Sequence, residues 1–377
     1  MNDKFYSQLT EKSLSGETLS RDIALDILTS KDIELLSLLQ AAYEVRKTFF
    51  GKAVRIHIIN NGQNGHCPED CHYCPQAKSS SAAIEEYPLK SDEEFLKEAK
   101  NAYEKGAYRY CMVFAGRGPT RSRVERLAHL IREIKSKYPI QVCVSAGLLD
   151  EDKAQVLKEA GLDRLNHNLN TSERQYPKIC TTHTYADRMN TLKAARSAGI
   201  KLCSGMIVGM HETHDDILDV VYALRDMQVE SIPVNLLIPI EGNKLNTTSE
   251  MSPEYCLRVL SLFRFLNPQS EIRVAAGREL HLRSLEALAF YPANSLFLEG
   301  YLNTRGAERS RTLQMIKDAG FTVESDHPLD ELIGNEEGVS NLQETSGVSK
   351  VLLKGLKELR PEKLSQTKTS TGCRSAS

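Results

Sequence analysis

Three cysteines, Cys67, Cys71 and Cys74, stand four and three residues apart. They follow an apolar, β-branched run at residues 54–60, so we expect them on a loop directly after a strand. Three thiolates on so short a loop lie close enough together to bind one metal ion or cluster. Soft thiolate ligands select zinc or an iron–sulfur cluster. A structural zinc site needs four closed ligands, whereas three thiolates on a four-iron cluster leave one iron open for a substrate. The spacing therefore favours a 4Fe–4S cluster with one open iron.

The alternative is a zinc knuckle in which His66 or His72 supplies the fourth ligand. The two interpretations differ in metal content, because an iron–sulfur protein is brown and contains iron and sulfide. A zinc protein of this kind would be colourless and would belong to the structural or interaction proteins.

A second group of residues lies on predicted strands: Cys111, Cys143, Cys203 and Arg273. Because side chains alternate along a strand, each cysteine can point into the interior of a barrel and meet the others there. An arginine between Ile272 and Val274 is unexpected in a strand, since a buried cation requires an anionic partner. A cluster bound by thiolates would supply that anion. The alternative is that each cysteine is an ordinary core residue and that Arg273 points outward to an acidic helix.

Polar residues gather at the predicted ends of other strands. Asn166 and Asn168 share one strand face, and Asn235 follows Pro233 on another strand. Apolar barrel strands rarely carry amides without a ligand or a buried network to satisfy them. These three amides therefore indicate a binding site at one end of the predicted strands. Cys180 and Cys256, in a loop and a helix, are interpreted as structural.

The elements that must position these residues alternate between short β-branched strands and helices. The predicted strands are 54–60, 108–114, 140–145, 163–169, 201–208, 231–237, 271–276 and 295–299. The helices between them are predicted at 91–105, 123–135, 151–160, 185–198, 215–226 and 253–266. This alternation predicts an α/β fold, a closed (β/α)8 TIM-type barrel with its active site at the carboxyl ends of the strands. A doubly wound open sheet is the alternative.

We expect three regions along the chain. Residues 1–50 are predicted to form an N-terminal helical cap, with Ser20 as an N-cap, and residues 51–326 the barrel. Residues 327–377 are polar and contain few apolar side chains, so we expect a flexible tail that the fold does not need.

The composition of the 377 residues narrows the class of protein. A net charge of −2 gives no indication of nucleic-acid binding, and no apolar run approaches the length of a membrane span. The nine cysteines are odd in number and the N-terminus has no export signal, so we expect metal or catalytic chemistry in the cytoplasm rather than disulfides.

Taken together, these motifs resemble the biotin synthases, a family of radical S-adenosylmethionine (SAM) enzymes. The resemblance extends from about residue 10 to about residue 326. It rests on these stretches: residues 67–76, 110–112, 166–172, 181–188, 203–205, 231–235, 277–279 and 293–295. So many separate motifs in the same order make the resemblance specific.

The resemblance implies a role for each site residue. Cys67, Cys71 and Cys74 would hold a SAM-binding 4Fe–4S cluster, and Cys111, Cys143, Cys203 and Arg273 an auxiliary 2Fe–2S cluster. The residues expected to contact SAM are Tyr73, Asn170, Arg188, Ile207 and Val208. Those expected to contact dethiobiotin are Asn166, Asn168 and Asn235. No side chain is expected to act as a general acid or base, because the cofactors carry the difficult step.

The implied reaction inserts sulfur between carbons 6 and 9 of dethiobiotin, with the sulfur taken from the 2Fe–2S cluster. A flavodoxin- or ferredoxin-like electron donor and a homodimer are implied as partners. The sequence departs from the family pattern at Met206, His211 and Ala275, which concerns the shape of the SAM pocket. Lipoyl synthase is a poorer match because it has a second set of loop cysteines, and a maturase-like relative would lack the strand cysteines.

Overall fold

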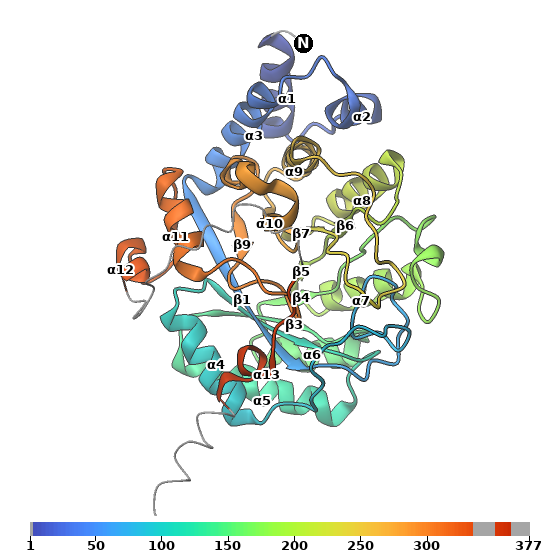
Figure 1. The fold of residues 1–377 in the computed structure, drawn as a ribbon, viewed down its shortest axis with the longest axis vertical. Helices are drawn as coiled ribbons and strands as arrows, with labels where there is room; N and C mark the ends of the chain where they lie inside the picture. Colours follow the sequence, from blue (N-terminus) through green and yellow to red (C-terminus); the bar gives the residue numbers. More distant parts are fainter. Residues whose placement is uncertain (1–2, 335–350, 363–377) are drawn as a thin grey trace, which may run out of the picture.

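The computed structural model describes residues 3–334 and 351–362. Its centre is a closed barrel of parallel strands, with helices around the outside (Figure 1). The barrel strands, in the order in which they pair, are β1 (Ala53–Gln63), β2 (Arg109–Phe114), β3 (Gln141–Ser145), β4 (Arg164–Asn166), β5 (Lys201–Cys203), β7 (Ser231–Leu236), β8 (Glu271–Val274) and β9 (Ser295–Phe297). Strand β9 pairs with β1 and closes the ring. The predicted (β/α)8 barrel is confirmed.

The helices between the strands begin and end within two residues of the predicted positions. They are α4 (Asp92–Glu104), α5 (Arg121–Lys137), α6 (Glu151–Glu159), α7 (Tyr185–Ser197), α8 (His214–Asp226) and α9 (Pro253–Leu266). Each begins after a residue whose side chain caps the first turn. In α4, for example, Ser91 and Glu94 form a reciprocal capping box. The short helix α10 (Arg278–Leu282) and the 3-10 turn η2 (Arg283–Phe290) lie between β8 and β9, and α11 (Arg309–Asp318) follows β9.

The predicted strand 201–208 is interrupted in the middle. It consists of β5 and a separate short strand, β6 (Met206–Val208), which pairs with the upper part of β7. The break falls at Gly205, where a Cβ atom would overlap the carbonyl oxygen of Pro233 on β7. Pro233 has no N–H to give to the ladder, so the backbone approaches closely here without a regular pairing. Glycine permits this approach.

The N-terminal helices are α1 (Asp3–Ser15), α2 (Arg21–Thr29) and α3 (Leu35–Phe50), and Ser20 caps α2 as predicted. They pack on α9 and share one apolar core with the barrel helices. Arg258 of α9 joins them to the barrel, because its guanidinium donates to the carbonyl oxygens of Ile27, Ser30 and Ile33 at 3.1, 3.1 and 2.6 Å. The division of the chain at residues 50 and 326 stays a prediction.

Two segments of the predicted flexible tail are packed on the barrel, so that prediction does not hold for them. After the short strand β10 (Thr322–Val323), α12 (Leu329–Gly334) buries Leu332. Residues 351–362, with α13 (Leu356–Leu359), bury Leu359 and Arg360. Composition alone missed this because the partners of these residues lie far away in the sequence. The rest of the tail, 335–350 and 363–377 with Cys373, lies outside the described residues.

Within the described ranges, no helix is both long and apolar enough to span a bilayer.

The role of Arg258 leads to a first prediction. Replacing Arg258 by Met should lower the free energy of unfolding by about 2–4 kcal/mol, because three carbonyl groups, two of them at buried positions, lose their donor. Urea denaturation measures this loss. The matched control is Arg132→Met on the exposed face of α5, which should change stability by less than about 0.5 kcal/mol. Equal losses in both variants would contradict the anchoring role.

Candidate active site

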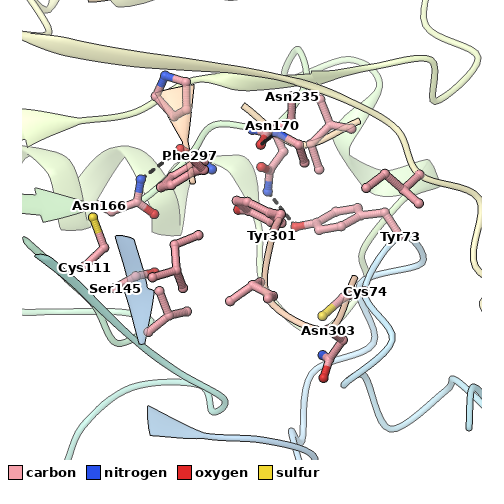
Figure 2. A pocket seen from close by; sticks show the side chains of 18 of the residues that line it. Tyr73, Cys74, Cys111, Ser145, Asn166, Asn170, Asn235, Phe297, Tyr301 and Asn303 are labelled. Carbon is pink, nitrogen blue, oxygen red and sulfur yellow. Dashed lines mark hydrogen bonds between the residues drawn. The ribbon is translucent and has the colours of Figure 1, made fainter. Parts of the chain in front are cut away.

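A cavity of about 270 Å³ occupies the interior of the barrel and opens at the carboxyl ends of the strands. Cysteines from both predicted groups line it, with Cys111 toward one end and Cys74 toward the other (Figure 2). Asn170 and Tyr73, which also line the cavity, are joined by a hydrogen bond (Figure 2). The cavity is therefore lined by one cysteine of the loop group and by the three strand cysteines.

The deeper group consists of Cys111, Cys143, Cys203 and Arg273, which are all buried and all line the cavity. Cys111 and Cys143 stand opposite each other on neighbouring strands β2 and β3. The guanidinium of Arg273 lies 3.7 Å from the Cys203 sulfur and 4.9 Å from the centre of the Phe297 ring. The four side chains that the sequence placed on four strands thus meet in one place.

A buried carboxylate that the sequence reasoning missed, Glu271, holds Arg273 in position. Arg273 donates to Glu271 at 2.6 Å and to Ser231 at 2.8 Å. Glu271 also accepts from Arg109 at 3.0 Å and from His57 at 2.9 Å. Glu271 stands two residues before Arg273 on the same strand face, which is the signal that could have revealed it.

Charge determines the protonation of this network. Burial raises the pKa of Glu271, but Arg109, His57 and Arg273 outweigh it and hold the pKa well below its ordinary value. Burial lowers the pKa of His57, which stays neutral. Burial also acts to lower the pKa values of Arg109 and Arg273, but Glu271 raises the first above its ordinary value, and Cys203 and Glu271 raise the second. Three guanidinium groups therefore face one carboxylate, since Arg55 also contacts Glu271, at 3.4 Å. A hydrogen bond with Cys143 and the charges of Arg273 and Arg109 lower the pKa of Cys111, whereas hydrogen bonds between the thiols and burial raise the pKa values of Cys143 and Cys203.

The second group, Cys67, Cys71 and Cys74, lies on the loop after β1, as predicted. Only Cys74 lines the cavity; Cys71 is buried beside it and Cys67 is half-buried. Burial raises the pKa of Cys74 to about 11 and also raises that of Cys67. The thiols are neutral in the metal-free protein, so metal binding would release protons.

Two carboxylates in the cysteine motif attach this loop to residues 180–183. Asp70 accepts from the backbone N–H groups of Thr181 and Thr182 at 2.9 and 3.2 Å. Glu69 accepts from the Thr182 hydroxyl at 2.6 Å and from His183 Nδ1 at 2.5 Å. The Glu-Asp pair between the cysteines therefore has a structural purpose that the cysteine spacing alone did not indicate.

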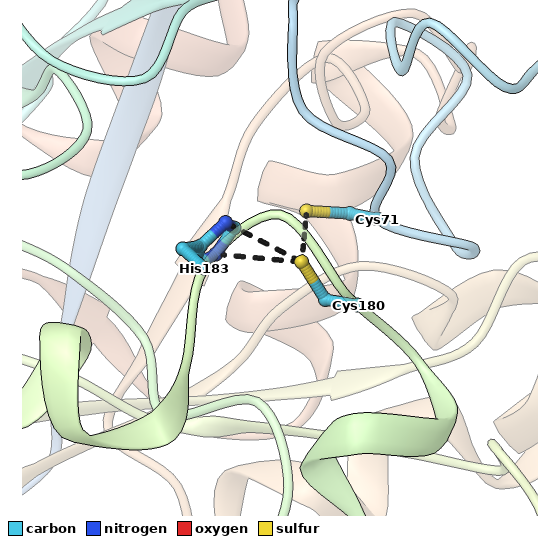
Figure 3. Close-up of side chains that lie close together, drawn as sticks. All are labelled: Cys71, Cys180 and His183. Atoms are coloured by element: carbon cyan, nitrogen blue, oxygen red, sulfur yellow. Dashed lines mark hydrogen bonds between the residues drawn. The ribbon is translucent and has the colours of Figure 1, made fainter.

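Cys180 lies beside the loop, with its sulfur 3.8 Å from that of Cys71 and 3.3 Å from His183 Nδ1 (Figure 3). The atoms of Cys71, Cys180 and His183 that can bind metal all lie within 4.8 Å of one another. The sequence analysis interpreted Cys180 as structural and did not consider His183. Nothing in the spacing links Cys180 to a cysteine 109 residues earlier, so only the fold reveals this contact.

The residues expected to contact SAM mostly surround the mouth of the cavity. Arg188 donates to the carbonyl oxygen of Asn168 and to His183 Nε2, both at 2.8 Å. Asn170 donates to the Tyr73 hydroxyl at 2.5 Å and has a left-handed backbone, with φ of 68°. Tyr73, Asn170, Arg188 and Ile207 line the cavity, whereas the side chain of Val208 lies in the apolar core. A direct side-chain role of Val208 is therefore not supported.

The three asparagines expected to contact substrate all line the cavity, but their amides also make hydrogen bonds within the protein. Asn168 Oδ1 accepts from Gly205 N at 3.1 Å, and Asn166 donates to the Cys203 sulfur at 3.2 Å. Asn235 donates to Met206 O at 3.1 Å and accepts from Ala276 N at 3.3 Å. Both the amide nitrogen and the amide oxygen of Asn235 are thus hydrogen-bonded to backbone atoms, and its contact with substrate stays a prediction.

Comparison with known proteins supports the resemblance that the sequence motifs indicated. Residues 64–223 match the Radical SAM superfamily, and residues 233–322 match the Biotin and Thiamin Synthesis associated domain. Biotin synthase of Acaryochloris marina (strain MBIC 11017) is 60% identical over 310 residues, which cover 82% of this chain and 90% of that protein. The chain belongs to the biotin synthase family. Biotin synthase of Magnetococcus marinus (strain ATCC BAA-1437 / JCM 17883 / MC-1) is 55% identical and covers 84% of this chain and 98% of its own.

Solved structures with lower identity share the fold. Methylornithine synthase (PylB) has a TM-score of 0.73 at 19% identity and covers 86% of this chain and 99% of its own. The FeFe-hydrogenase maturase HydG from Carboxydothermus hydrogenoformans has a TM-score of 0.71 at 20% identity, with 86% and 80% covered. The fold of this chain is therefore shared with proteins of much lower sequence identity.

The residues present fit the cofactors of the family, which are a 4Fe–4S cluster, a 2Fe–2S cluster and SAM. In the described part of the chain, Arg273 Nε is buried and has no hydrogen-bond partner, although it borders the cavity. Three thiols surround the same space, and soft thiolate donors suit iron and sulfide. The three loop cysteines match a cluster with one open iron.

The Glu271 network leads to a second prediction. Glu271→Gln should lower the free energy of unfolding at pH 7 by about 3–5 kcal/mol, because two buried guanidinium groups lose their counter-ion. The folded pKa of Glu271 lies below that of the unfolded chain, so its stabilisation is present above about pH 4.3 and is lost as the pH falls below that value. Urea denaturation across this pH range measures both effects.

The matched control is Glu324→Gln, since Glu324 pairs with Arg55 on the surface, where its side chain is 41% exposed. Its loss should cost less than about 1 kcal/mol. A loss in Glu271→Gln as small as in the control, or one that does not shrink in acid, would refute the central role of Glu271.

The contact between Cys180 and Cys71 leads to a third prediction. Cys180→Ala should leave the iron content unchanged but shift the reduction potential of the 4Fe–4S cluster, because Cys71, a proposed ligand of that cluster, loses its hydrogen-bond partner at 3.8 Å. Spectroelectrochemical titration measures the potential. Cys256→Ala, in the buried part of α9, is the matched control and should not shift it. An unchanged potential in Cys180→Ala would argue against this hydrogen bond.

Proposed function

We propose that this chain converts dethiobiotin to biotin by inserting one sulfur atom between carbons 6 and 9. The observation that carries the proposal is a single cavity lined by the three cysteines deep in the barrel and by Cys74, one of the three cysteines on the loop after β1. Membership of the biotin synthase family gives the substrate and the product. One cluster site with an open iron and one enclosed site suit an enzyme that generates a radical and then supplies sulfur.

Cys67, Cys71 and Cys74 would hold the 4Fe–4S cluster, and Cys111, Cys143, Cys203 and Arg273 the 2Fe–2S cluster. When bound, these groups and SAM supply a radical that removes hydrogen from unreactive carbons, and the sulfur that replaces it. The protein has to bind, orient and protect the reactants, since no acid or base activates a saturated carbon.

The surrounding residues suit that task. Arg188 and Asn170 present donors at the mouth of the cavity, where the carboxylate and ribose of SAM would lie. Asn166 and Asn168 border the space between the two cysteine groups, where a ureido ring would find donors and acceptors. Ile59, Val113 and Phe297 form apolar walls that help to keep water away from the reacting atoms.

The partners and location are further parts of this proposal. A flavodoxin- or ferredoxin-like protein would deliver electrons, two copies of the chain would form a homodimer, and the reaction would take place in the cytoplasm. The resemblance to the family supports these statements.

The test compares three cysteine variants after anaerobic reconstitution with iron and sulfide. Cys71→Ala should lose both 5′-deoxyadenosine and biotin, because the loop site loses a ligand. Cys143→Ala should lose biotin and the 2Fe–2S absorption while the 4Fe–4S cluster still assembles. Cys256→Ala, a buried cysteine that does not line the cavity, should behave as the wild type.

Two results would contradict the proposal. Biotin formation by Cys143→Ala at the wild-type rate would show that the sulfur does not come from a cluster held there. A colourless reconstituted protein that contains zinc and no sulfide would favour the zinc-binding interpretation.

A further inference from the structure

Residues 351–362, here called the C-terminal strap, return to the barrel and lie beside α4 (Figure 1). The strap lies beyond the Biotin and Thiamin Synthesis associated domain, whose match ends at residue 322. It contacts residues 299–305, here called the pocket loop, which follow β9. The strap is thus an addition to the matched part of the chain that touches its active-site region.

The pocket loop forms part of the cavity wall. Tyr301, Leu302, Asn303 and Thr304 all line the cavity, and Figure 2 labels Tyr301 and Asn303 in its wall. Tyr301 packs on Phe297 with 5.3 Å between ring centres, and Asn303 Oδ1 accepts from Asn64 at 2.6 Å. A displacement of this loop would therefore change the shape of the space proposed for substrate.

The strap pairs with the same loop through the backbone. Arg305 N donates to Leu352 O at 2.9 Å, and Lys354 N donates to Asn303 O at 2.8 Å. Thr304 and Leu353 form an antiparallel bridge between these two bonds. Pairing on this scale fixes the position of a loop, because each bond orders the backbone on both sides.

The pocket loop has a backbone that needs such support. Glu299 and Leu302 both adopt left-handed conformations, with φ of 64° and 46°. This region is unfavourable for side chains with a Cβ atom and costs roughly 1–3 kcal/mol for each residue. Such a conformation persists only where neighbouring groups hold it, and the strap supplies hydrogen bonds directly after Leu302.

The strap is anchored by one buried ion pair. Arg360 makes two hydrogen bonds to the Glu94 carboxylate, at 2.8 and 2.6 Å, and both side chains are 8% exposed. The guanidinium also lies over the Tyr87 ring, 5.2 Å from its centre. Glu94 is held in turn by the capping box at the start of α4. By contrast, the pair of Arg305 with Glu358 is exposed, so it contributes little.

A second, smaller cavity of about 90 Å³ lies between the strap and the pocket loop. Leu302 borders both cavities, and Lys354 and Leu359 of the strap close the outer one. The strap therefore forms part of the wall on the outer side of Leu302.

We propose that the C-terminal strap positions the substrate pocket by holding the pocket loop against the cavity, and that Arg360 is its anchoring residue. The proposal rests on the proposed function only for the choice of dethiobiotin as a probe. The strap and Arg360 touch neither the cysteines nor the residues expected to hold SAM, so they act through the loop.

The test compares chains that end at residue 350 and at residue 362, both reconstituted and loaded with SAM. The chain ending at 362 keeps the strap and is the control. The chain ending at 350 should bind dethiobiotin at least tenfold more weakly, and its pocket loop should exchange amide hydrogens at least tenfold faster. Its iron content and SAM affinity should be unchanged. Adding a synthetic peptide of residues 351–362 should restore both properties.

A point variant guards against a truncated chain that fails to fold. Arg360→Met should show the same two changes, whereas Lys357→Met, on the exposed side of α13, should show neither. Unchanged hydrogen exchange in residues 299–305 of Arg360→Met would overturn the proposal. If the wild type does not bind dethiobiotin, the proposed function fails, while the exchange measurement still decides the role of the strap.

Discussion

The closed end of the barrel depends on one buried carboxylate. Glu271 is 1% exposed and joins Arg273 on its own strand, Arg109 on β2, His57 on β1 and Ser231 on β7. Charges taken out of water are tolerated only when they are paired and hydrogen-bonded. Because Glu271 pairs with more than one guanidinium group, the site keeps a positive excess that suits anionic sulfur ligands. The direction of Arg273, and with it the cysteine site, follows from this arrangement.

The two cysteine sites are positioned by different means. The deeper cysteines stand on short parallel strands, where the barrel itself fixes their places. The outer cysteines stand on a loop, which a barrel cannot fix, and here Glu69 and Asp70 supply the missing restraint through Thr181, Thr182 and His183. The strands of the barrel thus fix the deeper cysteine site. Hydrogen bonds from side chains fix the outer cysteine site, which is the one proposed to admit a substrate.

Much of this arrangement could be predicted from local patterns. The cysteine spacing, the strand and helix periods and the capping residues gave the barrel and the positions of both cysteine sets. Contacts between residues distant in sequence could not be predicted in this way. Cys180 meets Cys71 from 109 residues away, and Arg360 meets Glu94 from 266 residues away. The polar composition around Arg360 predicted a flexible tail, because the energy of a buried ion pair depends on a partner that composition does not identify.

The attachment of the cysteine loop to residues 180–183 has a thermodynamic consequence. Arg188 donates to His183, and His183 donates to Glu69 between the loop cysteines, so one chain of contacts connects the two ligand-binding regions. A group bound at the cysteines orders the segment that presents Arg188 and thereby reduces the entropy lost when a second ligand binds there. By reciprocity, the second ligand strengthens retention of the first to the same degree. If these residues hold the groups proposed for them, metal retention and nucleoside affinity would therefore be two measures of a single coupling free energy.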